Sequence, residues 1–487
     1  MSAYSDQIKE QLLHELHDTS GLIVKSIGDK LAVSYMNGLV DSLQLNTNLL
    51  SRLPLHIKDE TLEDLMDRIA VGDCQVVAGI PDAIEKLLSG FVFVTLSDCV
   101  GGILVNLINI PSRSPSTAEV ETAIYGPSIA FTESMEKNIA LFRSYITNPD
   151  LVQETLEAGD KTNTQVSILY MKNESGNPFV DLVKQRIQAQ QFDGVIGSAL
   201  FLQMLQDKKY NLFPEISLTE RPDIAAQAIL EHKVVVLLEG NSQVIIGPNS
   251  FLDFFQSVDD RYSSWGIGLF NRLLRIFGVI MSVYLTPIYV AALTYHYEVI
   301  PSTLLVPLIE SRSRVPFPPL IESLILEVSI ELLREAGARL PTKVGQTMGI
   351  VGGIVIGQAA VQAGFTSNIL IMLVALAALG SFTTPNYMMG SAVRLIRFPM
   401  LFLAAWYGLI GIALISAFVF IHLLHMTSFG KPYLYPFYPL RKKDLMDTIL
   451  FTEPSKFEYE TKFTHVSKQE PKWKTSLKRL WQGNIDE

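Results

Sequence analysis

The sequence predicts a multidomain protein: an N-terminal cytoplasmic α/β region of two subdomains, an α-helical polytopic membrane domain, and a short polar C-terminal tail. Composition along the chain supports this division. Residues 1–275 have an ordinary soluble composition, residues 276–425 are mostly apolar, and residues 431–487 are polar again. A chain of 487 residues also exceeds one ordinary domain. We expect the two subdomains at 1–150 and 151–265, the membrane domain at 266–426 and the tail at 427–487.

The net charge argues against a nucleic-acid-binding protein, and the N-terminus argues against a signal peptide. A net charge of −10 leaves no basic field that would attract nucleic acid. Residues 1–18 are rich in charge and contain no apolar signal core, so we expect the first large domain to stay in the cytoplasm. The two cysteines, Cys74 and Cys99, do not make a disulfide framework, and we expect both in the core.

The first subdomain combines helices and strands. Apolar residues on one helix face predict a helix over residues 1–19. Runs rich in β-branched and aromatic residues predict strands at Phe91–Leu96 and Ile103–Ile110. A further helix is expected within 124–146, where Thr132 or Ser134 would cap it.

The second subdomain repeats this mixture. Strands alternate with helices along it, which favours a mixed sheet. The turn Glu239–Ser242 is typical of a hairpin. The predicted strands are Val166–Met171, Val234–Leu238 and Val244–Ile246, and the predicted helices are Pro178–Gln190, Gly197–Gln206 and Pro222–Leu230.

One polar cluster in the soluble region has two interpretations. It consists of Thr219, Glu220, Arg221 and Asp223, and it follows an aromatic-proline turn. The cluster could be a docking or signal-passing loop. It could equally be a helix cap, with Pro222 in the first turn and Asp223 near the positive end of the helix dipole.

Four stretches of the apolar region are long enough to cross the hydrocarbon of a bilayer. They are Ile276–Tyr295, Val344–Ala363, Ile369–Met389 with a bend at Pro385, and Phe398–Ile421. Four spans leave both termini inside, as Arg and Lys near the tail favour. If the acidic helix 320–340 were a fifth span, the tail would be outside, so we favour four spans and a partly embedded acidic helix.

The second of these spans carries no charge and has two unlike faces. Its glycines recur every four residues and so share one face, where another helix backbone can approach closely. The opposite face carries sparse polar residues, with apolar ones that could form a constriction closing by dewetting. The glycines are Gly345, Gly349, Gly353 and Gly357, and the constriction would be Val351, Ile354 and Val355.

The acidic helix before it contributes the candidate ion-handling residues. Ionisable groups at membrane depth are costly and usually face water or a bundle interior. Glu327, Glu331 and Glu335 could therefore face a cation-selecting aqueous path, although an amphipathic helix at the membrane surface explains them equally well. With them on the candidate path we place Thr347, Gln358 and Gln362.

Catalytic and cofactor chemistry has no support in the residue patterns. The sequence contains no P-loop, no GxGxxG and no HExxH, and no nucleophile stands beside a base. Paired histidines occur at His14 and His17 and at His422 and His425, where a surface helix and a helix end explain them better than a metal does. We expect no enzyme activity, no metal and no cofactor.

Six stretches of the chain are specific enough to indicate a family. In the membrane and tail regions they are VPFPPLIESLILEVSIELLREAGARLP (Val315–Pro341), GQTMGIVGGIVIGQAAVQAG (Gly345–Gly364), SFTTPNY (Ser381–Tyr387) and TSFGKPYLYPF (Thr427–Phe437). In the soluble region they are GPSIAF (Gly126–Phe131) and FPEISLTERPD (Phe213–Asp223). Together they resemble the A subunits of spore germination receptors, the GerA family. The SpoVA-operon F proteins share this architecture and are less similar in the acidic helix.

The resemblance implies a nutrient-sensing complex in the spore inner membrane, with the large N-terminal domain in the spore core. Such A subunits are expected to act with a transporter-like B subunit and a lipoprotein C subunit. They would oligomerise in the bilayer and form a path for monovalent cations that nutrient binding opens. The chain departs from the family pattern at Tyr125 and at Glu231–His232, where family members often carry a basic residue and a glycine.

Two alternative functions stay open from the sequence. Broken spans and polar groups in the membrane are also typical of a secondary transporter, although no internal repeat is visible. A non-conducting membrane scaffold whose soluble half recruits partner subunits is the other alternative.

Overall fold

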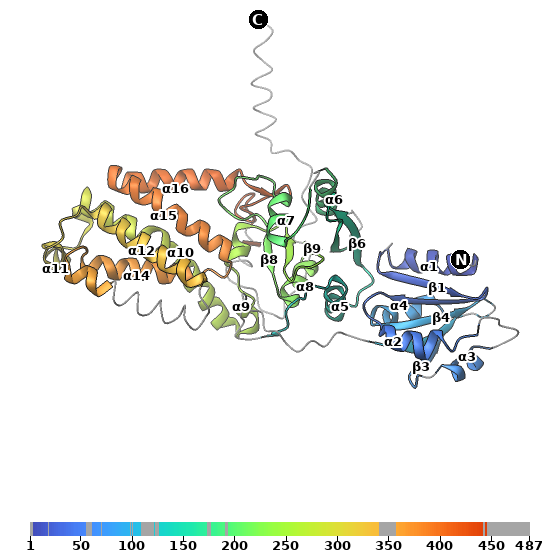
Figure 1. Cartoon of the computed structure of the whole chain (residues 1–487). Helices are drawn as coiled ribbons and strands as arrows, with labels where there is room; N and C mark the ends of the chain where they lie inside the picture. Colours follow the sequence, from blue (N-terminus) through green and yellow to red (C-terminus); the bar gives the residue numbers. More distant parts are fainter. Residues whose placement is uncertain are drawn as a thin grey trace, which may run out of the picture. The chain divides into compact units, whose positions relative to one another are not determined.

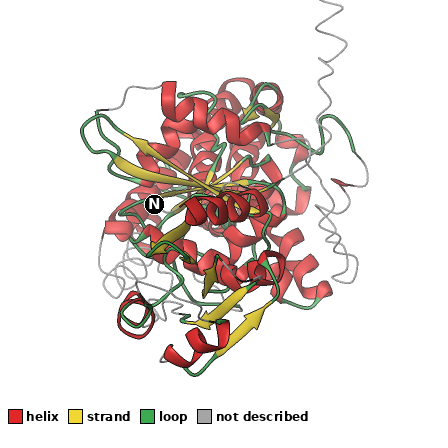
Figure 2. Cartoon of the chain, turned by 90° about the vertical axis from the view of Figure 1, so that its right-hand side faces the viewer, coloured by secondary structure: helices red, strands yellow, loops and turns green. Residues whose placement is uncertain are grey.

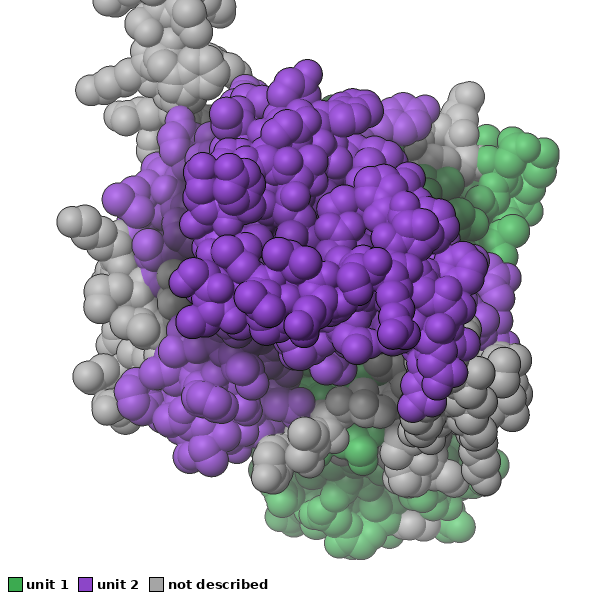
Figure 3. Space-filling view, turned by 90° about the vertical axis from the view of Figure 1, so that its left-hand side faces the viewer, with its two compact units in different colours: residues 1–209, 216–248, 457–487 green, residues 210–215, 249–456 purple. Residues whose placement is uncertain are grey.

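A computed structural model describes residues 3–17, 19–54, 61–69, 71–97, 99, 101–108, 121, 126–172, 177–189, 193–339, 357–441 and 444–445 (Figure 1). These residues divide into two compact units, coloured separately in Figure 3. Among the described residues, the α/β unit comprises the chain up to residue 209 and 216–248, and the helical unit comprises 210–215 and the described chain from 249 to 445. The short segment 210–215 thus belongs to the helical unit, although both of its flanks belong to the α/β unit.

The first half of the α/β unit is built on a five-stranded sheet with the order β1-β2-β4-β5-β3, in which every pair is antiparallel. Its strands are β1 (Leu22–Ile27), β2 (Leu31–Met36), β3 (Cys74–Val77), β4 (Phe91–Leu96) and β5 (Gly102–Asn106). Its helices are α1 (Ala3–Glu15), α2 (Ser42–Gln44), η1 (Leu45–Leu50), α3 (Leu62–Arg68) and α4 (Ile80–Leu88).

The second half has a sheet of the same size, with the order β6-β7-β9-β10-β8, and again every pair is antiparallel. Its strands are β6 (Leu151–Ala158), β7 (Thr164–Met171), β8 (Ser217–Thr219), β9 (Val234–Leu238) and β10 (Val244–Gly247). Its helices are α5 (Met135–Tyr145), α6 (Pro178–Ala189), α7 (Ser198–Leu205) and α8 (Pro222–Leu230). Figure 2 distinguishes the strands from the helices by colour.

The two halves share one chain path. Each begins with a hairpin, continues through helices to a strand at the far edge, and returns through one helix to a second hairpin. The returning helices, α4 and α8, both carry a Pro-Asp pair in their first turn, at Pro81-Asp82 and Pro222-Asp223. The prediction of a mixed sheet is wrong for the described strands, because tight hairpins join neighbours that a mixed sheet would connect by crossovers. The repeat is one of topology, which the sequence did not make visible.

Both faces of the first sheet are covered, so its central strands are buried throughout. Every residue of β2 and β4 is buried. One face packs against α1 and α4 through Leu12 and Leu87, and the other packs against η1 and α3 through Leu49 and Leu65. In the second half, α5 and α8 pack on the sheet, and Phe142 stacks on Phe131 with ring centroids 5.1 Å apart.

The helical unit is a bundle whose helix boundaries differ in part from the predicted spans. The first predicted span, Ile276–Tyr295, is part of a longer helix, Trp265–Thr294. Pro385, where a bend was expected in the third span, lies between two separate helices. The single span predicted at 398–421 is wrong, because Gly408 breaks the chain with φ 60° and ψ −139°. The predicted span 344–363 lies mostly outside the described residues. The helices are α9 (Asp259–Tyr262), α10 (Trp265–Thr294), α11 (Ser302–Arg312), α12 (Pro319–Arg339), α14 (Asn368–Phe382), α15 (Tyr387–Tyr407) and α16 (Leu409–Leu424).

A glycine contact brings α10 and α14 together. A Cβ added at Gly380 would lie 2.3 Å from the backbone oxygen of Gly278, so only glycine permits this approach. The bundle has a buried apolar core, but part of its polarity is reversed relative to a soluble protein. Buried polar side chains include Ser282, Thr286, Glu322, Ser323, Glu327, Arg394 and Arg397. Exposed apolar side chains include Phe270, Phe277, Leu379, Leu414 and Phe418.

An aromatic cluster closes the end of the bundle at which α10 begins. It gathers the segment 210–215, the 3-10 helix η2 (Phe251–Phe255) and the hairpin of β11 (Thr427–Ser428) and β12 (Lys431–Pro432). The Tyr433 hydroxyl donates to the Pro214 carbonyl at 2.6 Å, and Ser428 Oγ donates to the Glu215 carbonyl at 2.7 Å. Two of the six stretches that indicate the family, although distant in sequence, therefore meet in one place.

Candidate functional site

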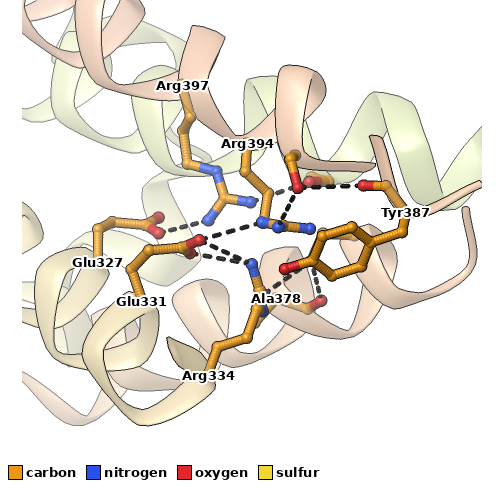
Figure 4. Close-up of polar contacts among 10 residues, drawn as sticks. Glu327, Glu331, Arg334, Ala378, Tyr387, Arg394 and Arg397 are labelled. Atoms are coloured by element: carbon orange, nitrogen blue, oxygen red, sulfur yellow. Dashed lines mark hydrogen bonds and ion pairs between the residues drawn. The ribbon is translucent and has the colours of Figure 1, made fainter. Parts of the chain in front are cut away.

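The polar face of α12 forms the most concentrated charge cluster among the described residues of the helical unit (Figure 4). Residues four apart lie along one row of a helix, so Ser323, Glu327 and Glu331 point in similar directions. Helices α10, α14 and α15 contribute the partners of this row.

Glu327 is the buried centre of the cluster, with only 3% of its side chain exposed. Its carboxylate forms an ion pair with Arg397 of α15 and accepts a hydrogen bond from Thr286 Oγ1 of α10 at 3.0 Å. Arg397 in turn donates to Ser282 Oγ at 2.9 Å. A buried charge is tolerated when it is paired and hydrogen-bonded, and these contacts meet both requirements.

Glu331 bridges two arginines one turn further along α12. Arg394 of α15 donates from Nε at 3.2 Å, and Arg334 of α12 itself donates from Nη1 at 2.9 Å. Arg334 also donates to Ser381 Oγ of α14 at 3.2 Å, so the cluster joins four helices, α10, α12, α14 and α15. Figure 4 shows the three guanidinium groups converging on the two carboxylates.

The charge balance of this cluster is positive, not negative. Three arginines, Arg334, Arg394 and Arg397, face two carboxylates. Glu335, the third predicted residue of the helix, lies outside the cluster and is exposed, with Arg339 donating to it at 2.9 Å. The structure therefore brings Glu327 and Glu331 together but leaves Glu335 on the surface.

The other predicted path residues are placed only in part. Gln358 and Gln362 are exposed, and a Cβ at Gly357 would meet nothing within 4 Å. The remaining residues lie in the stretch 340–356, outside the described residues: Thr347, Val351, Ile354, Val355, Gly345, Gly349 and Gly353.

Sequence reasoning missed several members of the buried polar network. Arg394 and Arg397 were not recognised as site residues, although two arginines three residues apart in an apolar helix indicate inward-facing partners. Glu322 was also missed. It is fully buried, accepts from the Ser367 backbone N–H at 2.7 Å and lies 3.4 Å from Arg312.

The polar cluster of the α/β unit (Thr219, Glu220, Arg221 and Asp223) forms hydrogen bonds within that unit. Arg221 and Asp223 are buried and share two hydrogen bonds, of 3.0 and 2.7 Å. Pro222 starts α8, and the Phe131 N–H donates to the Glu220 carbonyl at 2.8 Å. Thr219 donates to Glu121, and burial raises the pKa of the Glu121 carboxyl.

Two further features of the described residues bear on function: the arrangement of metal-binding side chains and the length of the apolar helices. Across the described ranges, no group of three or more His, Cys, Asp or Glu side chains is arranged to hold a metal ion. Two helices, Trp265–Thr294 and Tyr387–Tyr407, are long and apolar enough to cross a membrane, and α14 and α16 are shorter apolar helices.

Comparison with known proteins gives the family. A model of the family described as Bacillus/Clostridium GerA spore germination protein matches residues 7–462. This chain belongs to the GerA family. It is 41% identical to the spore germination protein GerQA of Bacillus cereus over 90% of this chain and 88% of that protein. It is 34% identical to the spore germination protein KA of Bacillus subtilis (strain 168) over 89% and 82%, respectively.

One solved structure is also similar to part of the chain. It is the N-terminal domain of the A subunit of the Bacillus megaterium spore germinant receptor GerK3. It shares 22% sequence identity with this chain, at a TM-score of 0.40, and the likeness covers 50% of this chain and 95% of that one.

Proposed function

We propose that this chain is the A subunit of a germinant receptor in the spore inner membrane, where it oligomerises and forms a nutrient-gated path for monovalent cations. Membership of the GerA family supports the receptor role. The observation that carries the membrane role is the reversed polarity of the helical unit, whose large exposed apolar surface would be unfavourable in water. The transporter-like B subunit and the lipoprotein C subunit would be its partners.

Aromatic residues at both ends of the bundle support its insertion into a bilayer. Tyr and Trp prefer the two interfaces between lipid and water. Exposed aromatic side chains occur at Trp265 and Tyr387, where α10 and α15 begin, and at Tyr295 and Trp406, where these helices end. The α/β unit and the tail would then lie in the spore core.

The cation path is proposed to lie between copies of the chain. Glu327 and Glu331 are neutralised inside one subunit, so they serve to hold the bundle together. Glu335, Gln358 and Gln362 are exposed and available to line a shared path. Rings of carboxylates favour cations in such paths. The apolar constriction at Val351, Ile354 and Val355 remains part of this proposal.

The test is the ion selectivity of the purified full chain, reconstituted with its B and C subunits in a planar bilayer. Under a KCl gradient, the reversal potential is expected near the potassium equilibrium potential. Glu335→Gln is expected to move it toward zero. The matched control is Glu298→Gln, another carboxylate of the helical unit, in the 3-10 helix η3 (Tyr297–Val299), which should leave selectivity unchanged. Absence of current from the folded oligomer would refute conduction.

A further inference from the structure

Helix α12 is held in the bundle by ion pairs and by a narrow apolar contact. Among its described side chains, Leu326 is the only large apolar one that is buried, and the half-buried Leu320, Leu324 and Ile330 pack with it against the neighbouring helices. Ile321, Ile325, Val328 and Leu332 are all at least 40% exposed. Consecutive prolines, Pro318 and Pro319, stand where the helix begins, and proline disfavours its extension backwards. Sliding α12 along its neighbours would therefore shift the contacts of Leu326 and its half-buried neighbours, but would not disrupt a wide apolar face.

The charges of α12 and α15 are spaced to match in more than one register. Glu327, Glu331 and Glu335 follow one another at intervals of four residues, close to one helical turn. Arg394 and Arg397 are three residues apart, also close to one turn. The two helices run antiparallel here, because the later glutamate, Glu331, pairs with the earlier arginine, Arg394.

We propose that α12 is a two-register charge ladder, in which a one-turn movement toward its own N-terminus exchanges ion-pair partners with α15. In the second register Glu331 takes the place of Glu327 opposite Arg397, and Glu335 takes the place of Glu331 opposite Arg394. This inference rests on the proposed function, for which it supplies the gating movement. One-turn ratchets of a helix past its neighbour are a known form of switch between packed states.

Only movement toward the N-terminus keeps both arginines of α15 paired. Two ion pairs with α15 are broken and two are formed, and Glu335 is drawn from the surface to the buried arginines. The cost is that Glu327 moves to the buried position of Ser323 and Glu322 leaves the Ser367 N–H. In the opposite direction Ser323 would take the place of Glu327, and Arg397 would lose its carboxylate. A buried arginine without a partner is strongly unfavourable, so that direction is disfavoured.

The intrahelical partners travel with the ladder. Glu331 already bridges Arg334 within α12 and Arg394 across to α15. Glu335 has a similar intrahelical ion pair, with Arg339 four residues along instead of three. In the observed register, Arg339 is the partner of Glu335 among the described residues, so Glu335 is poised to accept Arg394 in the second register.

The ladder predicts opposite effects for two similar substitutions on one helix. Glu327→Gln removes an ion pair only from the observed register, so it should populate the second register. Glu335→Gln removes an ion pair only from the second register, so it should leave the observed one intact. The double variant Glu327→Gln/Glu335→Gln loses one pair in each register and should return toward the observed state.

The experiment measures the position of α12 directly in the purified full chain. Spin labels are placed at Ile288 of α10 and Leu332 of α12, both exposed, after replacing Cys74 and Cys99 by serine. Thr286 lies level with Glu327, and Tyr289 lies near the Ser367 that contacts Glu322, so α10 and α12 run antiparallel. Leu332 and Ile288 are thus offset along the helix axes, and the second register brings them closer by up to about 5 Å.

Pulsed dipolar spectroscopy should give one distance for the unsubstituted protein. Glu327→Gln should add a second, shorter distance, which Glu327→Gln/Glu335→Gln removes. Arg339→Gln is the matched control: it breaks the exposed ion pair of Glu335 but keeps the carboxylate, so Arg339→Gln combined with Glu327→Gln should retain the shorter distance. If Glu327→Gln does not yield folded protein, Thr286→Val, which removes only the hydrogen bond to Glu327, should produce the same distance at lower population.

A single unchanged distance in Glu327→Gln and Thr286→Val would overturn the ladder. So would a shorter distance that persists when Glu335→Gln is added. The distance between the spin labels does not depend on ion conduction. The charge ladder and the cation path can therefore fail separately. Conduction with α12 fixed would refute the ladder alone, and a moving α12 without any current would refute the conducting path.

Discussion

The α/β unit and the helical unit differ in where they place large apolar side chains and charged side chains. In the α/β unit, leucine, valine and phenylalanine fill the interior, as at Leu12 and Phe142. In the helical unit, the large apolar side chains Leu414 and Phe418 lie outside, whereas Glu327 and Arg397 lie inside. The proposed membrane insertion of the helical unit predicts this difference, because a side chain is placed by what surrounds the fold, water for one unit and lipid for the other. Four sets of substitutions test the comparison, in decreasing order of expected effect.

Arg397→Ala should have the largest effect. It leaves the Glu327 carboxylate buried without its cation, a change that typically costs about 3–5 kcal/mol. The expected result is a large fall in the apparent melting temperature of the detergent-solubilised protein. Arg339→Ala breaks an exposed ion pair, which is worth about 0–1 kcal/mol, and should change little. Equal effects of the two substitutions would mean that the buried cluster does not hold the bundle together.

Leu12→Ala and Leu414→Ala compare the same deletion in the two units. Leu12 is fully buried in the first core, where such a deletion costs about 2–5 kcal/mol. Leu414 is exposed on α16, so its loss should stay within about 0.5 kcal/mol in detergent. Thermal unfolding followed by circular dichroism measures both. A large effect at Leu414 would show that protein covers that face.

Gly380→Ala tests the close crossing of α10 and α14. The added methyl group would press against the Gly278 carbonyl, and overpacking of this kind costs about 1–3 kcal/mol. Gly357→Ala is the matched control, because its Cβ would enter open space and alanine favours a helix by up to about 1 kcal/mol. The two variants should therefore shift the melting temperature in opposite directions. Loss of stability in Gly357→Ala would indicate that another surface packs on this glycine.

Glu121→Gln should have the smallest effect and the opposite sign. Burial raises the pKa of this carboxyl, so its contribution to stability is present at low pH and is lost as pH rises through the raised pKa. A neutral glutamine can still accept the hydrogen bond from Thr219. The variant should raise the melting temperature of the α/β unit by about 2 °C at pH 7 and weaken its dependence on pH between 4 and 7. A lower melting temperature at pH 7 would show that the ionised form is the stabilising one.

Local patterns in the sequence predicted much of the fold. Hydrophobic periodicity and turn residues indicated three of the five strands of the second half but only two of the five of the first half, and the apolar runs indicated part of the helices of the bundle. The sheet pairing was not predictable in this way, because antiparallel pairing of β2 with β4 depends on contacts between residues far apart in sequence. Gly408 was not recognised as a break, because an isolated glycine in an apolar run carries no signal of its φ angle.

The candidate site was predicted only in part. Glutamates in an apolar helix indicated inward-facing charge. Glu327 is buried in the bundle, whereas the side chain of Glu331 is 42% exposed although it pairs with Arg394. Their neutralisation by Arg394 and Arg397 was missed, since those arginines are more than sixty residues away in sequence. The helical period also drifts by a fixed angle at each step of four residues, which turns Glu335 away from the interior.

Fluorescence quenching by brominated lipids tests most directly the proposal that water surrounds the α/β unit and lipid surrounds the helical unit. Single-tryptophan proteins would carry Phe418→Trp or Ile196→Trp, with the four native tryptophans replaced by phenylalanine. Both positions are exposed, at 67% and 81%, but Phe418 lies in the helical unit and Ile196 in the α/β unit. In bilayers brominated deep in the acyl chain, we expect strong quenching at 418 and little at 196. Equal, weak quenching at both positions would contradict the assignment of lipid to the helical unit.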